Sequence, residues 1–129
     1  LASRVEGATK KVGTPTLITG HTRQQLGEEF ATRRLCSVRV VGKSEPVDLF
    51  ELHTATATSE WKLRRDQFES ALRDFESGQW NEVCTAVFPL LRNPDGTNDG
   101  PSLCLISRAV DCLNSPPVPF DPVWNLMSK

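Results

Sequence analysis

The feature that most constrains this chain is a change in hydrophobic periodicity at a Thr/Ala-rich stretch, residues 53–59. Before it, two strand-like runs, residues 30–41 and 47–52, flank the turn sequence Gly-Lys-Ser-Glu-Pro, which predicts an antiparallel hairpin. After it, apolar residues recur about every 3.6 positions, as in amphipathic helices. We therefore expect two parts joined by a linker: residues 1–53, 54–60 and 61–129.

The segments before the hairpin predict two further short helices and a strand. One helical face is formed by apolar residues at helical spacing: Leu1, Val5, Ala8 and Val12. No N-cap residue precedes Leu1, so we expect this helix to begin upstream of the first residue. Gly13 is placed to end it. Residues 14–19 are rich in β-formers and carry Pro15 near their start, which favours an edge strand. Residues 20–27 have a short helical pattern that ends in glycine.

The second part carries three apolar stripes at helical spacing, which predict three helices. The first stripe consists of Trp61, Phe68, Leu72 and Phe75, and Gly78 ends it. The second consists of Trp80, Val83, Val87 and Leu91, and Pro89 should kink or end that helix. The third consists of Leu103, Ile106, Val110 and Leu113, with Pro101 near its start. The tail, residues 115–129, has four prolines and should be extended. Its apolar residues could lie along a groove: Val118, Phe120, Val123 and Trp124.

The segment from Phe68 to Val83 resembles the middle of a tetratricopeptide repeat (TPR), because a glycine separates two runs that combine small and large apolar residues. Only about one and a half such units fit here, fewer than the three that stand alone. Two interpretations remain open. One is a peptide-binding groove lined by Phe75, Trp80 and Val83 that the chain's own tail leaves open. The other is a helical cap that packs on its neighbour.

Composition narrows the class of protein. The 129 residues are 38% apolar and 24% charged, with a net charge of −1 and a mean hydropathy of −0.33. These values fit a soluble globular chain and exclude a disordered, collagen-like or purely coiled-coil chain. The charge balance gives no basic field for nucleic acid, and no apolar run approaches the length of a membrane span.

The four cysteines carry no metal-ligand spacing, since none forms a Cys-x-x-Cys pair and the chain has only two histidines. Each cysteine has apolar neighbours, so we interpret all four as reduced, structural thiols of a cytoplasmic protein. The alternative is a disulfide or a reactive thiol.

Three blocks in residues 1–52 share their order and spacing with a known family. They are LASRVEG (1–7), GTPTLIT (13–19) and VRVVGKSEPVDLFEL (38–52). Together they resemble the C-terminal end of a class III nucleotide cyclase domain, and the helical part is similar to an extension found in some bacterial members. The resemblance implies an α+β fold: a C-terminal fragment of a ferredoxin-like cyclase domain, with two helices and about three strands that end in the hairpin, plus a small TPR-like helical region.

The resemblance also implies chemistry. Family members are lyases that cyclise ATP or GTP and release pyrophosphate in intracellular signalling. They use two Mg²⁺ or Mn²⁺ ions held by two aspartates, at sites formed in a dimer interface. One helix supplies an asparagine and, four residues later, an arginine. Arg4 matches that arginine, which would stabilise charge in the phosphoryl transition state. Without the resemblance, Arg4 would be interpreted as an exposed helix arginine.

Other family residues are missing from this sequence. The asparagine would precede Leu1, and the two metal-binding aspartates and the purine-reading residues lie further upstream in the family. Asp48 cannot replace the aspartates, because one carboxylate on a strand does not hold two metals. The chain starts without methionine, so we expect a catalytically silent fragment without a cofactor, of a parent that is cytoplasmic or attached to a membrane through upstream regions.

The hairpin departs from the family pattern at its turn. Many relatives carry a phosphate-contacting lysine directly before the turn glycine, where this chain has Val41. Lys43, just past Gly42, is the candidate substrate-phosphate contact, and the alternative is a solvated turn lysine. Gly-Lys-Ser in this turn lacks the upstream glycine and the following helix of a phosphate-binding loop.

Two expectations concern partners. Residues 1–52 would lack the sheet with which they normally pair, and their exposed edges and apolar face favour a homodimer or an intertwined assembly. A function from a different class stays open as well. In that alternative, the helical part is a non-catalytic interaction or regulatory module that binds a protein partner.

Overall fold

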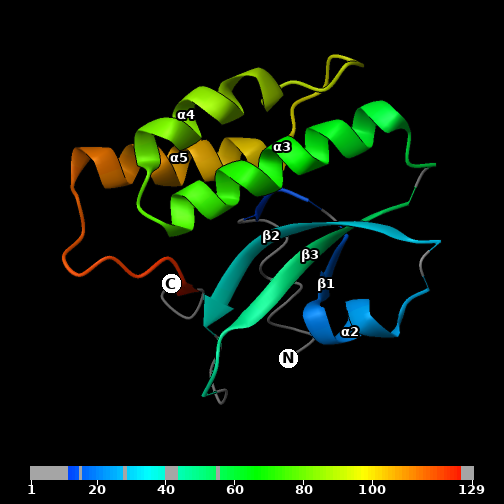
Figure 1. The fold of residues 1–129 in the computed structure, drawn as a ribbon, viewed down its shortest axis with the longest axis horizontal. Helices are drawn as coiled ribbons and strands as arrows, with labels where there is room; N and C mark the ends of the chain where they lie inside the picture. The colour runs from blue at the N-terminus through cyan, green and yellow to red at the C-terminus, as the bar shows by residue number, and fades with distance from the viewer. Residues whose placement is uncertain (1–11, 15, 28, 40–43, 55, 126–129) are drawn as a thin grey trace. The chain divides into compact units, whose positions relative to one another are not determined.

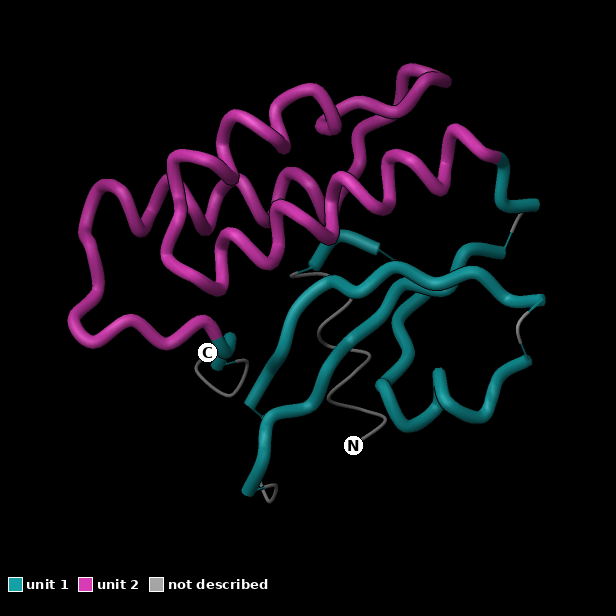
Figure 2. The backbone as a smooth tube through the Cα atoms, viewed as in Figure 1, with its two compact units in different colours: residues 1–58, 123–129 teal, residues 59–122 magenta. Residues whose placement is uncertain are grey.

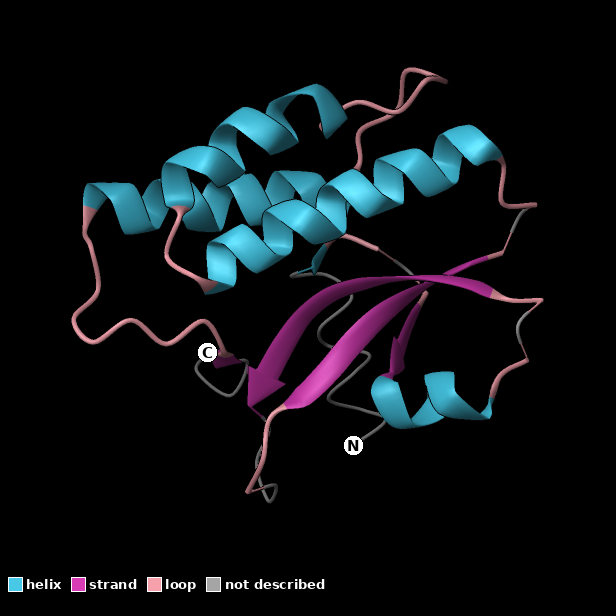
Figure 3. Cartoon of the chain, in the orientation of Figure 1, coloured by secondary structure: helices cyan, strands magenta, loops and turns pink. Residues whose placement is uncertain are grey.

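The computed structural model describes residues 12–14, 16–27, 29–39, 44–54 and 56–125. The chain forms two compact units, shown in different colours in Figure 2: residues 1–58 with 123–129, and residues 59–122. Within the described residues the secondary structure is mixed α+β, with four α-helices, one short 3₁₀ helix and one four-stranded sheet (Figures 1 and 3). The mixed α+β class expected from the sequence is therefore confirmed.

The sheet belongs to the first unit and consists of β1 (Leu17–Thr19), β2 (Ala31–Arg39), β3 (Val47–His53) and β4 (Trp124–Asn125). Its order is β1-β3-β2-β4, with β3 antiparallel to both β1 and β2. The antiparallel pairing of β2 with β3 confirms the predicted hairpin. Of the predicted turn, residues 42–46, the structure describes residues 44–46. Strand β1 lies at the edge, as the proline before it predicts. Strand β4 pairs parallel with β2 and was not predicted, because its tail was expected only to be extended.

A β-bulge in β2 explains why buried residues lie on both of its faces. Arg34 is opposite Phe50, and Cys36 is opposite Leu49, so Leu35 has no partner of its own in the register. The extra residue shifts the side-chain alternation, and both Leu35 and Cys36 are at least 96% buried. They contribute to the core of this unit together with Val38 and Leu49.

Helix α2 (Gly20–Gln25) follows β1 directly, within the predicted residues 20–27. The hydroxyl oxygen of Thr19 accepts a hydrogen bond from the backbone N–H of Thr22, which caps the helix. The predicted helix over residues 1–12 lies outside the described residues except for Val12, which is buried. Gly13 has a φ of 87°, a value that suits a glycine at a helix end.

The second unit consists of α3 (Ser59–Glu76), α4 (Trp80–Val87), the 3₁₀ helix η1 (Phe88–Leu90) and α5 (Gly100–Asn114). The three predicted helices are confirmed, and α4 gives way to η1 at Pro89, as expected. Helix α4 packs against both α3 and α5. The core side chains of this unit are at most 3% exposed: Phe68, Ala71, Leu72, Phe75, Val83, Val87, Leu105 and Ala109.

Gly78 makes the sharp reversal between α3 and α4. Its φ is 80°, a left-handed value that a residue with a Cβ adopts only at a cost. Its N–H donates to Phe75 O at 3.0 Å, and Gln79 N–H donates to Asp74 O at 2.8 Å. These bonds satisfy carbonyls at the end of α3 and set the start of α4 two residues later.

The third apolar stripe is not the buried face of α5. Leu103, Val110 and Leu113 are 41%, 42% and 38% exposed. The residues of α5 that are buried are Pro101, Ser102, Leu105 and Ala109. Two of these buried residues, Ser102 and Ala109, have small side chains, which permit a neighbouring element to approach α5 closely. A hydrophobic pattern favours large apolar residues and therefore misses them. None of the described helices is long and apolar enough to cross a membrane.

Candidate functional site

The two predicted site residues, Arg4 and Lys43, lie outside the described residues. The structure does describe the strands that flank the hairpin turn and the whole helical unit. These regions give three polar clusters, one open pocket and one aromatic cluster.

Asp48, on β3 just after the turn, is engaged by β2. The Ser37 hydroxyl donates to Asp48 Oδ1 at 2.5 Å, and Arg34 Nη2 lies 2.9 Å from Ser37 Oγ and 3.6 Å from Asp48 Oδ1. A single carboxylate beside a guanidinium does not fit a two-metal site. Among the residues that the structure describes, no group of three His, Cys, Asp or Glu side chains is arranged to hold a metal ion.

An open pocket of about 350 Å³ lies between the start of α2 and the start of β3. Thr19, His21 and Gln24 line one side, and Pro46 and Asp48 line the other. The lining offers hydroxyl, imidazole, amide and carboxylate groups, and none of its described residues is a lysine or arginine. These side chains suit a small polar ligand better than a phosphate, because a phosphate is normally met by cationic side chains.

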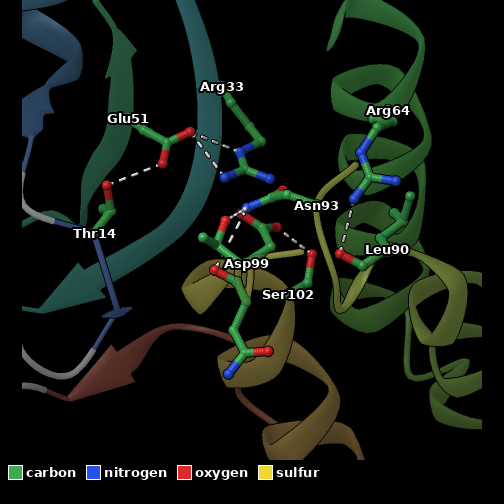
Figure 4. Close-up of polar contacts among 10 residues, drawn as sticks. Thr14, Arg33, Glu51, Arg64, Leu90, Asn93, Asp99 and Ser102 are labelled. Carbon is green, nitrogen blue, oxygen red and sulfur yellow. Dashed lines mark hydrogen bonds and ion pairs between the residues drawn. The ribbon is translucent and has the colours of Figure 1, made fainter. Parts of the chain in front are cut away.

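A buried network joins β2, β3 and the segment before β1 (Figure 4). Arg33 donates from Nε and Nη2 to Glu51 Oε1 at 3.1 and 2.8 Å, and Thr14 Oγ1 donates to Glu51 Oε2 at 2.9 Å. Nearby, Arg23 Nε donates to Thr32 Oγ1 at 2.9 Å. Both oxygens of the Glu51 carboxylate accept hydrogen bonds, so we interpret this network as structural and not as a reactive site.

The helical unit has its own polar contacts around the loop between η1 and α5 (Figure 4). Arg64 Nη2 on α3 donates to the carbonyl oxygens of Leu90 and Arg92, each at 3.1 Å. At the start of α5, the fully buried Ser102 donates its hydroxyl to Asp99 Oδ2 at 2.5 Å. These bonds satisfy groups at helix ends and hold the loop in place.

We define the aromatic site as Phe75, Trp80 and Arg108, which come from three different helices of the same unit. Phe120 from the tail meets both rings edge to face, with centroids 5.6 Å from Phe75 and 5.1 Å from Trp80. The Arg108 guanidinium lies 4.6 Å from the Phe75 ring centroid and donates from Nη2 to Pro122 O at 3.1 Å. The chain's own tail therefore occupies the aromatic residues on which the peptide-groove interpretation depends.

Sequence reasoning found three of these four residues. Phe75 and Trp80 were singled out as groove residues, and Phe120 as an apolar residue of the tail. Arg108 was missed, because an arginine on a helix is ordinarily a solvated side chain. Its one sequence signal is its place on α5, three residues after the buried Leu105.

The cysteines form no disulfide. Burial raises the pKa of the Cys104 thiol above its ordinary value of 9.0, and the nearby Arg108 charge opposes this shift. The pKa of Cys112 is also raised, again mainly by burial. A raised pKa lowers the thiolate fraction at neutral pH, so these two residues are poor candidates for nucleophilic catalysis.

Comparison with known proteins finds an adenylate cyclase of Dictyostelium discoideum, named as terminal-differentiation specific. It is 30% identical over 133 aligned positions, which cover 89% of this chain and 6% of that protein. No protein-family model matches the chain, and no solved structure matches it. The matched part, 89% of this chain, is longer than either compact unit, so the similarity includes residues of both units. The chain is thus similar to a small region of an adenylate cyclase.

Proposed function

We propose that this chain is the C-terminal section of a class III nucleotide cyclase. The parent protein would convert ATP, or GTP, to the cyclic nucleotide and pyrophosphate in cytoplasmic signalling. The similarity to an adenylate cyclase carries the proposal, because it covers 89% of the chain and reaches both units. The antiparallel β2–β3 pair supports it, since the family blocks in this chain end in such a hairpin.

In this proposal Arg4 is the catalytic arginine. A fixed guanidinium fork at this place would meet the negative charge that develops on the phosphates in the transition state. Lys43, in the turn between β2 and β3, would contact a substrate phosphate. The turn departs from the family pattern at Val41, so Lys43 would act from the other side of Gly42.

The described residues of this chain do not fit the two metal ions of the family. Asp48, which as a single carboxylate cannot replace the two aspartates, is engaged by Ser37 and Arg34. We therefore place the Mg²⁺ or Mn²⁺ ligands in upstream residues of the parent. We also expect the parent to be a homodimer, and the isolated 129-residue chain to be inactive.

The parent protein with Arg4→Ala tests this proposal. Activity is measured as cyclic nucleotide formed from ATP and from GTP in the presence of Mn²⁺. We expect kcat to fall roughly 10³-fold, the lower end of the effect of a charge-stabilising arginine in phosphoryl transfer. Lys62→Ala is the control, because Lys62 is exposed on α3 and should leave the rate unchanged. A parent that forms no cyclic nucleotide, or an Arg4→Ala variant with full activity, would contradict the proposal.

A second candidate function is a non-catalytic interaction or regulatory module formed by the TPR-like helical part. One observation bears on it. The peptide-groove interpretation requires that the tail leave the groove open, whereas Phe120 and the carbonyl of Pro122 occupy the aromatic site. A partner of this module would therefore bind at another face of the helical part.

A further inference from the structure

Two residues with a hydroxyl group directly precede a proline in this sequence, Thr14 and Ser115. The structure distinguishes them by the access to their hydroxyls. Thr14 is 5% exposed, and its hydroxyl donates to Glu51 Oε2 at 2.9 Å. Ser115 is exposed and follows the last residue of α5, and its described hydrogen bond is that of its backbone N–H to Asp111 O, at 3.0 Å. Of the two hydroxyls, that of Ser115 is therefore the one that an enzyme can reach in the folded chain.

The backbone around Ser115 suits an enzyme that binds its substrate as an extended peptide. Residues 113–119 are exposed without interruption, and residues 115–123 form neither helix nor strand (Figure 1). Ser115 has a φ of −139° and a ψ of 81°, outside the helical region. Pro116 favours such a conformation, because a proline disfavours the helical region for the residue before it. The contacts of Phe120 and of β4 lie beyond this stretch, so access to Ser115 does not require release of the tail.

We propose that Ser115 is a phosphorylation site for a proline-directed serine/threonine protein kinase, and that the phosphate loosens the C-terminal end of α5. In this step the Ser115 Oγ attacks the γ-phosphorus of ATP, and an O–P bond forms. The bond from the γ-phosphorus to the bridging oxygen breaks, ADP leaves with the electron pair, and the hydroxyl proton passes to a carboxylate of the kinase. The inference goes beyond both candidate functions and depends on neither.

The surroundings of Ser115 repel the charge of a phosphate, which is about −1.5 to −2 at pH 7. The C-terminus of a helix carries partial negative charge, and the last turn of α5 contains no basic residue. The exposed Asp111, four residues before Ser115, adds a like charge. The arginine of α5, Arg108, lies seven residues before Ser115, which is roughly 10 Å along the helix axis. Its guanidinium is engaged with the Phe75 ring and with Pro122 O, so repulsion is the larger effect.

The test uses the full 129-residue chain, ATP and a purified proline-directed kinase, with timed peptide mass spectrometry as the readout. A synthetic peptide of residues 110–120 gives the rate for the same sequence when it is unfolded. Ser115 of the folded chain should be phosphorylated at a rate similar to that of this peptide. Thr14 should be phosphorylated at least roughly tenfold more slowly than Ser115, because local unfolding must first expose it.

Variants of the chain show which residue the kinase recognises. Ser115→Ala should abolish the modification of this segment. Pro116→Ala should slow it at least roughly tenfold, the lower end of what a subsite fitted to one side chain discriminates. Ser107→Ala is the matched control, since Ser107 is exposed on α5 and is not followed by a proline, and it should leave the rate at Ser115 unchanged. The site is overturned if neither peptide nor chain reacts, if the chain reacts much more slowly than the peptide, or if Thr14 reacts as fast as Ser115.

Amide hydrogen exchange of the phosphorylated and the unmodified chain tests the effect on α5. The N–H groups of Asn114 and Ser115 should exchange roughly two- to fivefold faster after phosphorylation, the range of a charge at a helix terminus. The rates are compared with those of the same peptide with and without phosphate, which removes the direct effect of the phosphate on exchange. High salt should reduce the difference, because it screens the repulsion. Unchanged exchange, or slower exchange through pairing with Arg108, would overturn the loosening of α5. Cyclase activity of the parent enters none of these outcomes.

Discussion

Arg33 on β2 and Glu51 on β3 form a buried ion pair, with Nη2 2.8 Å from Oε1 and side-chain exposures of 9% and 15%. The two residues are directly opposite each other in the sheet register. A buried ion pair is weak evidence for net stabilisation, because both charges lose their hydration. Its removal is informative nevertheless, since the loss of one partner leaves the other charge buried and uncompensated.

We predict that Glu51→Gln lowers the free energy of unfolding by about 3 kcal/mol, as for other buried pairs that lose one partner. Urea unfolding followed by circular dichroism measures the change. Asp66→Asn is the control, because Asp66 pairs with Arg65 on the surface, with 65% of its side chain exposed. It should change the stability by less than about 1 kcal/mol. Equal effects of the two substitutions would contradict a structural role for the buried pair.

The buried face of α5 gives a second prediction. Ala109 is fully buried and Val110 is 42% exposed, although the hydrophobic pattern favours Val110 as the packing residue. Ala109→Leu should destabilise the helical unit by about 1–3 kcal/mol, because it adds volume to a filled contact. Val110→Ala should change the stability by less than about 0.5 kcal/mol, as expected for a surface position. Thermal unfolding of both variants provides the measurement. A larger loss of stability for Val110→Ala than for Ala109→Leu would show that the predicted apolar stripe is the buried face of α5.

These residues also show how far the sequence predicts the fold. The hairpin, the three helices, the turn at Gly78 and the helix end at Pro89 follow from local rules of periodicity and backbone conformation. The face of α5 does not, because burial of Ser102 and Ala109 depends on how closely a neighbouring element approaches. Strand β4 was missed for a related reason: two residues, Trp124 and Asn125, carry no local signal, and their strand exists only through pairing with β2.

The same distinction applies to the candidate site. The sequence indicates Phe75, Trp80 and Phe120 as large apolar residues. The contact of Phe120 with the other two rings depends on the path of the tail, which no local pattern predicts. The one sequence signal for Arg108 is its place three residues after Leu105. Its importance depends on contacts with a ring 33 residues away in sequence and with a carbonyl in the tail. The assignments of Arg4 and Lys43 depend on family resemblance alone and stay predictions.

A third prediction concerns the reversal between α3 and α4. A Cβ at Gly78 would have no atom within 4 Å, so the cost of a substitution comes from its φ of 80°. Gly78→Ala should destabilise the chain by about 1–2 kcal/mol, the cost of the left-handed conformation for a residue with a Cβ. Gly78→Asn should cost less, because asparagine tolerates that conformation better. Chemical unfolding of the two variants should give this order, and a harmless Gly78→Ala would show that the backbone adopts another conformation here.

The last prediction follows from the raised pKa of Cys104, whose cause is burial in α5. A thiol with a higher pKa in the folded state favours the protonated form, so its stabilising contribution is complete below pH 9.0 and is lost as the pH rises through the folded-state pKa. Alkylation of Cys104 by iodoacetamide should therefore be slower in the folded chain than in urea at the same pH, since the thiolate is the nucleophile. Peptide mass spectrometry after timed labelling distinguishes Cys104 from the other cysteines, and the Cys104→Ser chain confirms the assignment. Equal rates in the folded and unfolded chains would mean that this thiol is not shielded by the helical unit.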